Sequence, residues 1–128
     1  MFKWNEEYKL GVKEIDKQHK KLFEIGNKLK ELLDDSREEK INDILEIINE
    51  LIDYTVYHFD SEEKYFEDID FDSKEKHIEK HKKFVSYLKN IEYKKVIDNE
   101  DEFLNDLAKY ISVWIIQHIK REDREYVK

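Results

Sequence analysis

The 128-residue sequence contains no cysteine and no proline, and it has only two glycines. Without cysteine the chain cannot form disulfides, thiolate-bound zinc sites, cysteine-ligated iron–sulfur clusters or a cysteine nucleophile. Any metal would therefore have to be held by imidazole and carboxylate groups. The scarcity of glycine and proline, together with many Lys, Glu, Ile and Leu residues, favours an all-α fold.

The sequence also lacks a long apolar run and an excess of basic residues. No stretch approaches the roughly 20 apolar residues that a membrane-spanning helix needs. Residues 1–10 do not contain the apolar core of a signal peptide. The formal net charge of -8 argues against nucleic-acid binding, which depends largely on clustered Lys and Arg. We therefore expect a cytoplasmic protein with neither a membrane nor a nucleic acid as its partner.

Apolar residues recur at helical spacing in four segments. The expected helices cover, approximately, residues 15–33, 41–67, 72–91 and 103–119. Helices of this length with short connections predict an up-down-up-down antiparallel four-helix bundle. An irregular N-terminal arm, residues 1–14, precedes it, and the length predicts a single domain over residues 1–128.

Two details of the connections can be predicted as well. The third helix can start near Asp72, because the spacing from Asp72 to Glu75 suits a capping box. Residues 92–99 are expected to form a connector that leads to the fourth helix.

All five histidines fall on the expected inward faces, with at least one on each helix: His19, His58, His77, His81 and His118. A single buried histidine is more often a core residue with a hydrogen-bond partner than a metal ligand. Five of them in one small core favour a metal site. His77 and His81 are also four residues apart, so both side chains project from the same side of a helix.

Two acidic residues extend this set of candidate ligands. Glu62 lies four residues after His58 and shares its inward stripe, whereas Glu63 and Glu67 are expected to be solvated. Asp123 lies five residues after His118, which is about 140° around an ideal helix. Helical periodicity alone therefore does not pair Asp123 with His118, and a surface position is its simplest interpretation.

The combined spacing resembles the ligand signature of the hemerythrins in their bacterial single-domain form. That signature reads His19, then His58-x-x-x-Glu62, then His77-x-x-x-His81, then His118-x-x-x-x-Asp123. The similarity extends to Trp4, Gly11, Ile15-Asp16-Lys17-Gln18-His19-Lys20, His58-Phe59-Asp60-Ser61-Glu62-Glu63, Trp114 and Tyr126. The sequence departs from the family pattern at Tyr65, Phe66 and Ile115-Ile116, residues expected in the pocket wall.

This resemblance implies a non-haem di-iron centre with an oxo or hydroxo bridge. One iron would be bound by His77, His81 and His118, the other by His19 and His58, and both would be bridged by Glu62 and Asp123. Such a ligand set leaves a single open position, on the iron with fewer histidines. The implied function is reversible binding of dioxygen, for its transport, storage or delivery, by a protein that is not an enzyme. We expect a monomer.

Reversible oxygen binding requires that water and outside reductants stay away from the site. The expected dry wall consists of Leu22, Phe23, Phe59, Phe66, Phe84, Trp114, Ile115 and Ile119. For any single member, plain core packing is the simpler explanation. Burial of so many imidazoles and carboxylates also predicts that the metal-free form is less stable than the iron-bound form.

Three other functions fit parts of the pattern. A di-iron oxidase or peroxidase of the ferritin type needs Glu-x-x-His elements on two helices, and the nearest approach is Asp16 before His19. An oxygen- or redox-sensing module would need a separate signalling protein as its partner. An oxygen carrier could instead deliver oxygen to an oxygen-consuming protein. A zinc site is disfavoured because the sequence has neither His-Glu-x-x-His nor a cysteine pattern.

Overall fold

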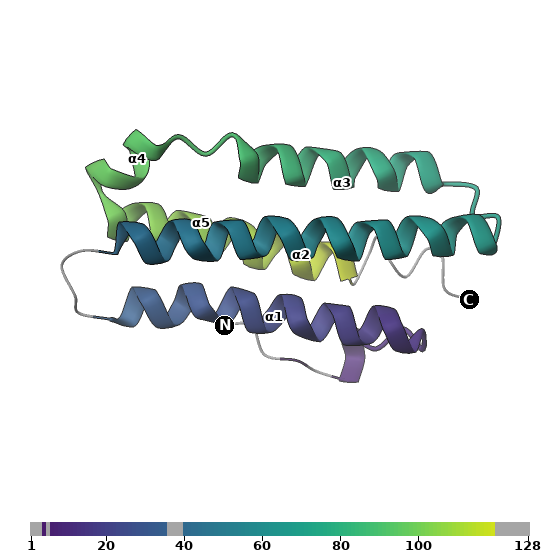
Figure 1. Ribbon diagram of the computed structural model, residues 1–128. Helices are drawn as coiled ribbons and strands as arrows, with labels where there is room; N and C mark the ends of the chain where they lie inside the picture. The colour runs from purple at the N-terminus through teal and green to yellow at the C-terminus, as the bar shows by residue number, and fades with distance from the viewer. Residues whose placement is uncertain (1–3, 5, 36–39, 120–128) are drawn as a thin grey trace.

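The structure, a computed structural model, describes residues 4, 6–35 and 40–119, and in these residues the chain forms helices and no strand (Figure 1). The elements are the 3₁₀ helix η1 (Glu6–Tyr8) and the α-helices α1 (Lys13–Asp34), α2 (Ile41–Asp68), α3 (Lys74–Lys89), α4 (Tyr93–Asp98) and α5 (Glu100–Gln117). The chain reverses direction between the long helices α1, α2, α3 and α5, which lie side by side. The predicted all-α antiparallel bundle is confirmed.

The bundle core follows from the helical spacing of large apolar residues. Each long helix contributes side chains that are essentially inaccessible to solvent, among them Ile25, Ile44, Phe84 and Leu104. Complete burial of one such side chain stabilises the fold by roughly 1.5–3 kcal/mol. Between α3 and α5 the contact is made largely by rings, with Phe84 stacked on Trp114 at a centroid distance of 3.9 Å. No described helix combines the length and the apolar character that crossing a bilayer would require.

The N-terminal arm is tied to the start of α1. The buried carboxylate of Asp16 accepts hydrogen bonds from the backbone amides of Leu10, at 2.8 Å, and Gly11, at 3.1 Å. Gly11 has a φ of 88°, a left-handed conformation that favours glycine. Asp16, the closest approach to a ferritin-type motif, therefore shapes the turn into α1.

Helix α2 ends in a Schellman motif that also prepares the surroundings of the site. Asp70 has a φ of 53°, and its amide donates to the carbonyl of Glu67, while the Phe71 amide donates to the carbonyl of Phe66 at 3.0 Å. The apolar contact that accompanies this motif is present, because the Phe66 and Phe71 rings lie 5.2 Å apart. The motif therefore places Phe71 beside the first turn of α3.

One predicted detail of the connections is wrong, and another connection contains a helix that the sequence did not indicate. Helix α3 begins at Lys74 after Ser73, which makes no side-chain capping hydrogen bond, so the capping box from Asp72 to Glu75 does not form. Asp72 and Ser73 lie instead in a turn in which the Lys74 amide donates to the carbonyl of Phe71 at 3.3 Å. Residues 92–99 contain the short helix α4, which forms because Val96 is completely buried in the core.

At the other end of the bundle, where α2 and α5 begin, the buried residue Lys40 connects these two helices. The backbone amide of Lys40 donates to Glu100 at 2.8 Å, and its ammonium group lies 3.0 Å from a carboxylate oxygen of Asp101. Helix α5 begins after Asn99, whose side chain accepts a hydrogen bond from the amide of Glu102. These contacts fix the starts of α2 and α5 against each other.

Candidate metal centre

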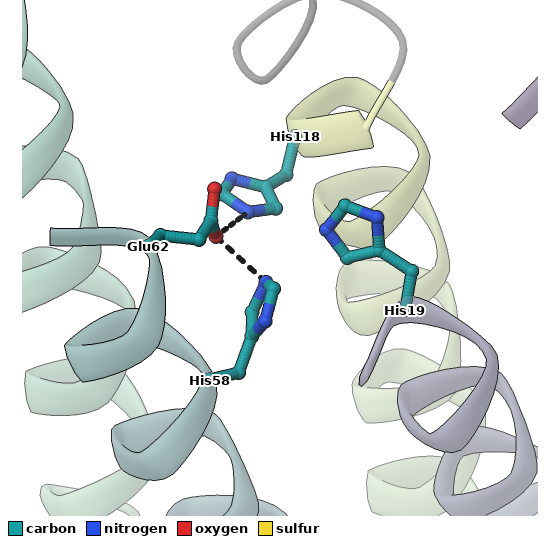
Figure 2. A group of neighbouring side chains, drawn as sticks. All are labelled: His19, His58, Glu62 and His118. Atoms are coloured by element: carbon teal, nitrogen blue, oxygen red, sulfur yellow. Dashed lines mark hydrogen bonds and ion pairs between the residues drawn. The ribbon is translucent and has the colours of Figure 1, made fainter. Parts of the chain in front are cut away.

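Four of the predicted ligands meet inside the bundle, and Figure 2 shows their side chains pointing toward one another. His19 comes from α1, His58 and Glu62 from α2, and His118 from the end of α5. Each of the four side chains is at most 2% exposed. One potential ligand atom from each residue lies within 4.8 Å of all the others. This group of four, named here the central cluster, is compact enough to hold a metal ion.

The Glu62 carboxylate lies at the middle of the central cluster. Its Oε1 atom is 2.6 Å from Nε2 of His58 and 2.8 Å from Nε2 of His118. The His19 ring lies against the His58 ring at a centroid distance of 4.7 Å and against the His118 ring at 5.8 Å. One carboxylate oxygen therefore contacts imidazoles from two different helices.

Helix α3 contributes the two remaining histidines. Nε2 of His81 lies 3.8 Å from Oε1 of Glu62, so His81 borders the central cluster without belonging to it. His77 is buried one turn earlier on the same helix, where its ring contacts those of Phe66 and Phe71 at centroid distances of 5.4 and 5.1 Å. Asp123 lies outside the residues that the structure describes.

The end of α5 departs from regular α-helical geometry at the site. His118 and Ile119 have π-helical character, the geometry in which hydrogen bonds can join residues five apart, and the His118 amide itself donates to the carbonyls of Trp114 and Ile115. π-Helical geometry brings residues with a spacing of five closer to the same side of the helix than regular α-helical geometry does. The spacing from His118 to Asp123 is of this kind.

Comparison with known protein families gives a match over most of the chain. Residues 10–128 match the family described as the hemerythrin HHE cation binding domain. A bacteriohemerythrin of Clostridium acetobutylicum is 35% identical over 128 residues, which cover 99% of each chain. The chain belongs to the hemerythrin family.

Relatives from other organisms agree with this assignment. A hemerythrin-like protein of Naegleria gruberi is 33% identical over 125 residues, covering 98% of this hemerythrin and 90% of the relative. A bacteriohemerythrin of Pseudomonas paraeruginosa is 32% identical over 125 residues, covering 97% and 78%, respectively. The resemblance that the spacing of the ligand signature indicated is therefore confirmed at the level of the family.

Two residues that the sequence analysis did not predict as partners of the histidines contact the Nδ1 atoms of His58 and His81. Nδ1 of His58 lies 2.8 Å from Oε1 of Gln18, and Nδ1 of His81 lies 3.1 Å from Oε2 of Glu63. The expectation that Glu63 is a solvated carboxylate is wrong, since its side chain is only 31% exposed and contacts His81. Glu67, by contrast, is exposed as expected. The available signal was position, because Gln18 and Glu63 directly adjoin His19 and Glu62.

Aromatic rings cover the site from the sides of α2 and α5. The Phe59 ring stacks on His81 with a centroid distance of 3.8 Å and an interplanar angle of 4°. The half-buried Trp114 ring stacks on His118 at 4.7 Å and 14°. The other residues expected in the wall, from Leu22 to Ile119, are all buried. The described surroundings of this hemerythrin site are thus largely apolar.

The electrostatics of the site favour a bound cation. Burial alone would raise the pKa of the Glu62 carboxyl, but attraction and hydrogen bonds from His118 and His58 outweigh it, and its pKa lies well below the usual range. Burial lowers the pKa of His81 to about 3, although the Glu62 charge opposes this shift. The structure therefore combines a carboxylate with an imidazole that is neutral at pH 7, and both are in the forms that metal binding requires.

The chemistry of the donors fits an iron ion. Imidazole nitrogen and carboxylate oxygen both bind iron, and the described site offers no thiolate. Nε2 of His81 is buried and has no hydrogen-bond partner in the described part of the chain, and Oε1 of Glu62 lies 3.8 Å from it. A buried nitrogen without a partner is costly, and coordination of a metal ion would remove that cost.

Proposed function

We propose that this hemerythrin binds two iron ions and takes up dioxygen reversibly, as a carrier, store or delivery protein. The proposed ligands are those of the sequence signature: His19, His58, Glu62, His77, His81, His118 and Asp123. The observation that carries the proposal is the central cluster, in which three buried imidazoles surround one buried carboxylate. Two ferrous ions held there would supply the two electrons and the open coordination position that oxygen binding needs.

Glu62 is the proposed bridging ligand. Its carboxylate contacts His58 and His118, residues that the family resemblance assigns to different iron ions. A ligand that belongs to both ions has to reach the histidines of both groups, and Glu62 does so from one turn beyond His58 on α2. The π-helical character at His118 supports Asp123 as the second bridge, because it favours a spacing of five residues on one side.

The apolar surroundings support a binding function over an enzymatic one. Phe59 and Trp114 each cover one face of a site histidine, and Phe66 is completely buried against His77. These rings shield the site from water on those faces, whereas His81 also lines a surface pocket with Asp60, Glu63 and Lys82. Reversible binding depends on this exclusion, because outside protons and reductants would consume bound oxygen.

The proposal is tested by loading the full-length chain with ferrous iron under anaerobic conditions and exposing it alternately to air and argon. We expect two irons per chain and a visible charge-transfer band that appears in air and fades in argon. Binding of two irons without such a band would contradict oxygen binding while leaving the metal site intact. Binding of one iron or none would contradict the di-iron centre itself.

Acid is expected to weaken the metal-free fold. The pKa of His81 is lowered from 6.5 to about 3 on folding. Between these values the unfolded chain binds a proton that the folded chain does not, so the free energy of unfolding falls as the pH drops from 6.5 toward 3. The depressed pKa of Glu62 adds a second loss below pH 4.5.

Urea unfolding in the presence of a chelator at pH 7.5, 6, 5 and 4 measures this dependence. A His81→Phe variant has no such group to titrate and should show a shallower decline from pH 6.5 downward. Equal declines in the two proteins over that range would contradict the assignment to His81.

A further inference from the structure

A buried amide connects one histidine of the central cluster to a serine on the same helix. Gln18 is 3% exposed, and its side chain from α1 reaches α2 at two points. Its Oε1 lies 2.8 Å from Nδ1 of His58, and its Nε2 donates to Oγ of Ser61 at 3.1 Å. The amide thus has one partner at each end, three residues apart on α2.

Ser61 determines which end of the amide faces which partner. Its hydroxyl donates to the backbone carbonyl of Tyr57, four residues earlier, at 3.1 Å. This is the usual back-bond of a helical serine. Because the only hydroxyl proton is used in this bond, the Ser61 oxygen is left as an acceptor. It therefore selects the NH₂ end of Gln18 and turns the amide oxygen toward His58.

An amide oxygen can only accept a hydrogen bond, so Nδ1 of His58 has to carry a proton. In the neutral ring, Nε2 is then left with its lone pair. This atom lies 2.6 Å from the Glu62 oxygen; without metal a proton shared between the two accounts for that distance, and a metal ion bound to both would replace it. The opposite amide orientation would present NH₂ to Nδ1 and move the ring proton to Nε2, where it would obstruct a metal ion.

We infer that Ser61 and Gln18 act together as positioning residues that keep the proton of His58 on Nδ1 and present Nε2 to the metal. This inference rests on the proposed metal site and adds the mechanism that prepares one of its ligands. Partners of this kind typically change metal affinity 10- to 100-fold when removed.

The decisive comparison uses two substitutions at the same buried position of the full-length chain. Gln18→Glu keeps an acceptor next to Nδ1, whereas Gln18→Leu has a similar size and no acceptor. Ferrous affinity, measured anaerobically by competition with a chelator, is expected to fall about 10- to 100-fold in Gln18→Leu and to stay within about threefold of wild type in Gln18→Glu. Equal losses in both would show that Gln18 acts only through packing and would overturn the inference.

Ser61 provides a second test at a half-buried position. Ser61→Ala removes the acceptor that orients the amide and should weaken ferrous binding, whereas Ser61→Thr keeps the hydroxyl and should restore it. Ser86→Ala, an exposed serine on α3, is the matched control and should bind like wild type. Wild-type affinity in Ser61→Ala would overturn the role of Ser61.

A spectroscopic readout separates this inference from the proposed function. In full-length protein labelled with ¹⁵N-histidine, the nitrogen shifts of His58 report which ring atom is protonated. We expect a protonated Nδ1 in wild type and a growing population with the proton on Nε2 in Gln18→Leu. An unprotonated Nδ1 in wild type would overturn the inference even if iron binds, whereas a protonated Nδ1 in a protein that binds no iron would overturn the proposed function and the metal-presenting part of the inference, and leave only the orientation of His58.

Discussion

Replacing Glu62 by Gln is expected to abolish the paired iron site and with it the oxygen-dependent absorption band. The amide has nearly the same size as the carboxylate, so the packing of α2 is kept while the negative charge of the central cluster is lost. An amide also donates through one of its ends, which opposes the two cations that His58 and His118 would hold. Because removal of an outer partner costs about 10- to 100-fold, we expect removal of this bridging ligand to cost more than 100-fold in iron affinity.

Iron content after gel filtration and anaerobic chelator competition measure this effect. Glu67→Gln is the matched control, because it makes the same chemical change at an exposed position on the same helix. It should bind iron as wild type does. A Glu62→Gln protein that retained two irons and the reversible band would refute the bridging role of Glu62.

Iron loading is expected to raise the thermal midpoint of unfolding by about 10–20 °C. A ligand that binds only the folded state at 1,000 times its dissociation constant stabilises that state by about 4 kcal/mol. For a chain of 128 residues, each kcal/mol corresponds to roughly 3–5 °C. The metal-free fold is the less stable one, because it buries five imidazoles and their carboxylate neighbours without a metal ion.

The measurement compares calorimetric midpoints of the ferrous and chelator-treated proteins under argon. Glu62→Gln offers a second comparison, since chelation should leave its midpoint nearly unchanged. Equal midpoints for loaded and metal-free wild type would contradict a buried metal site, whatever the iron content of the sample.

The positions of the helices and of the central cluster follow from periodicity in the sequence. His58 and Glu62 share a helix face because they lie four residues apart, and burial of that face brings them into the core. The spacing of His118 and Asp123 could not be understood in this way. A periodic pattern does not contain the departure from α-helical geometry at His118, and the position of Asp123 stays a prediction.

Partners of the outer histidine nitrogens were beyond sequence reasoning for another reason. Glu63 lies beside Glu62 on α2, and only the side on which α3 packs decides that it meets His81 instead of solvent. Gln18 reaches His58 across the interface between α1 and α2. Helix α4 was missed because its sequence carries a single buried apolar residue, Val96, which is too few to produce a period.

The stacked rings have an entropic consequence for ion binding. Phe59 lies flat against His81, and Trp114 lies nearly flat against His118, so each of these imidazoles is confined to one plane before any ion arrives. Immobilising a side chain on binding costs about 0.5–1.5 kcal/mol. In this protein that ordering is completed during folding, and the two histidines are preorganised to capture an ion with little further loss of freedom.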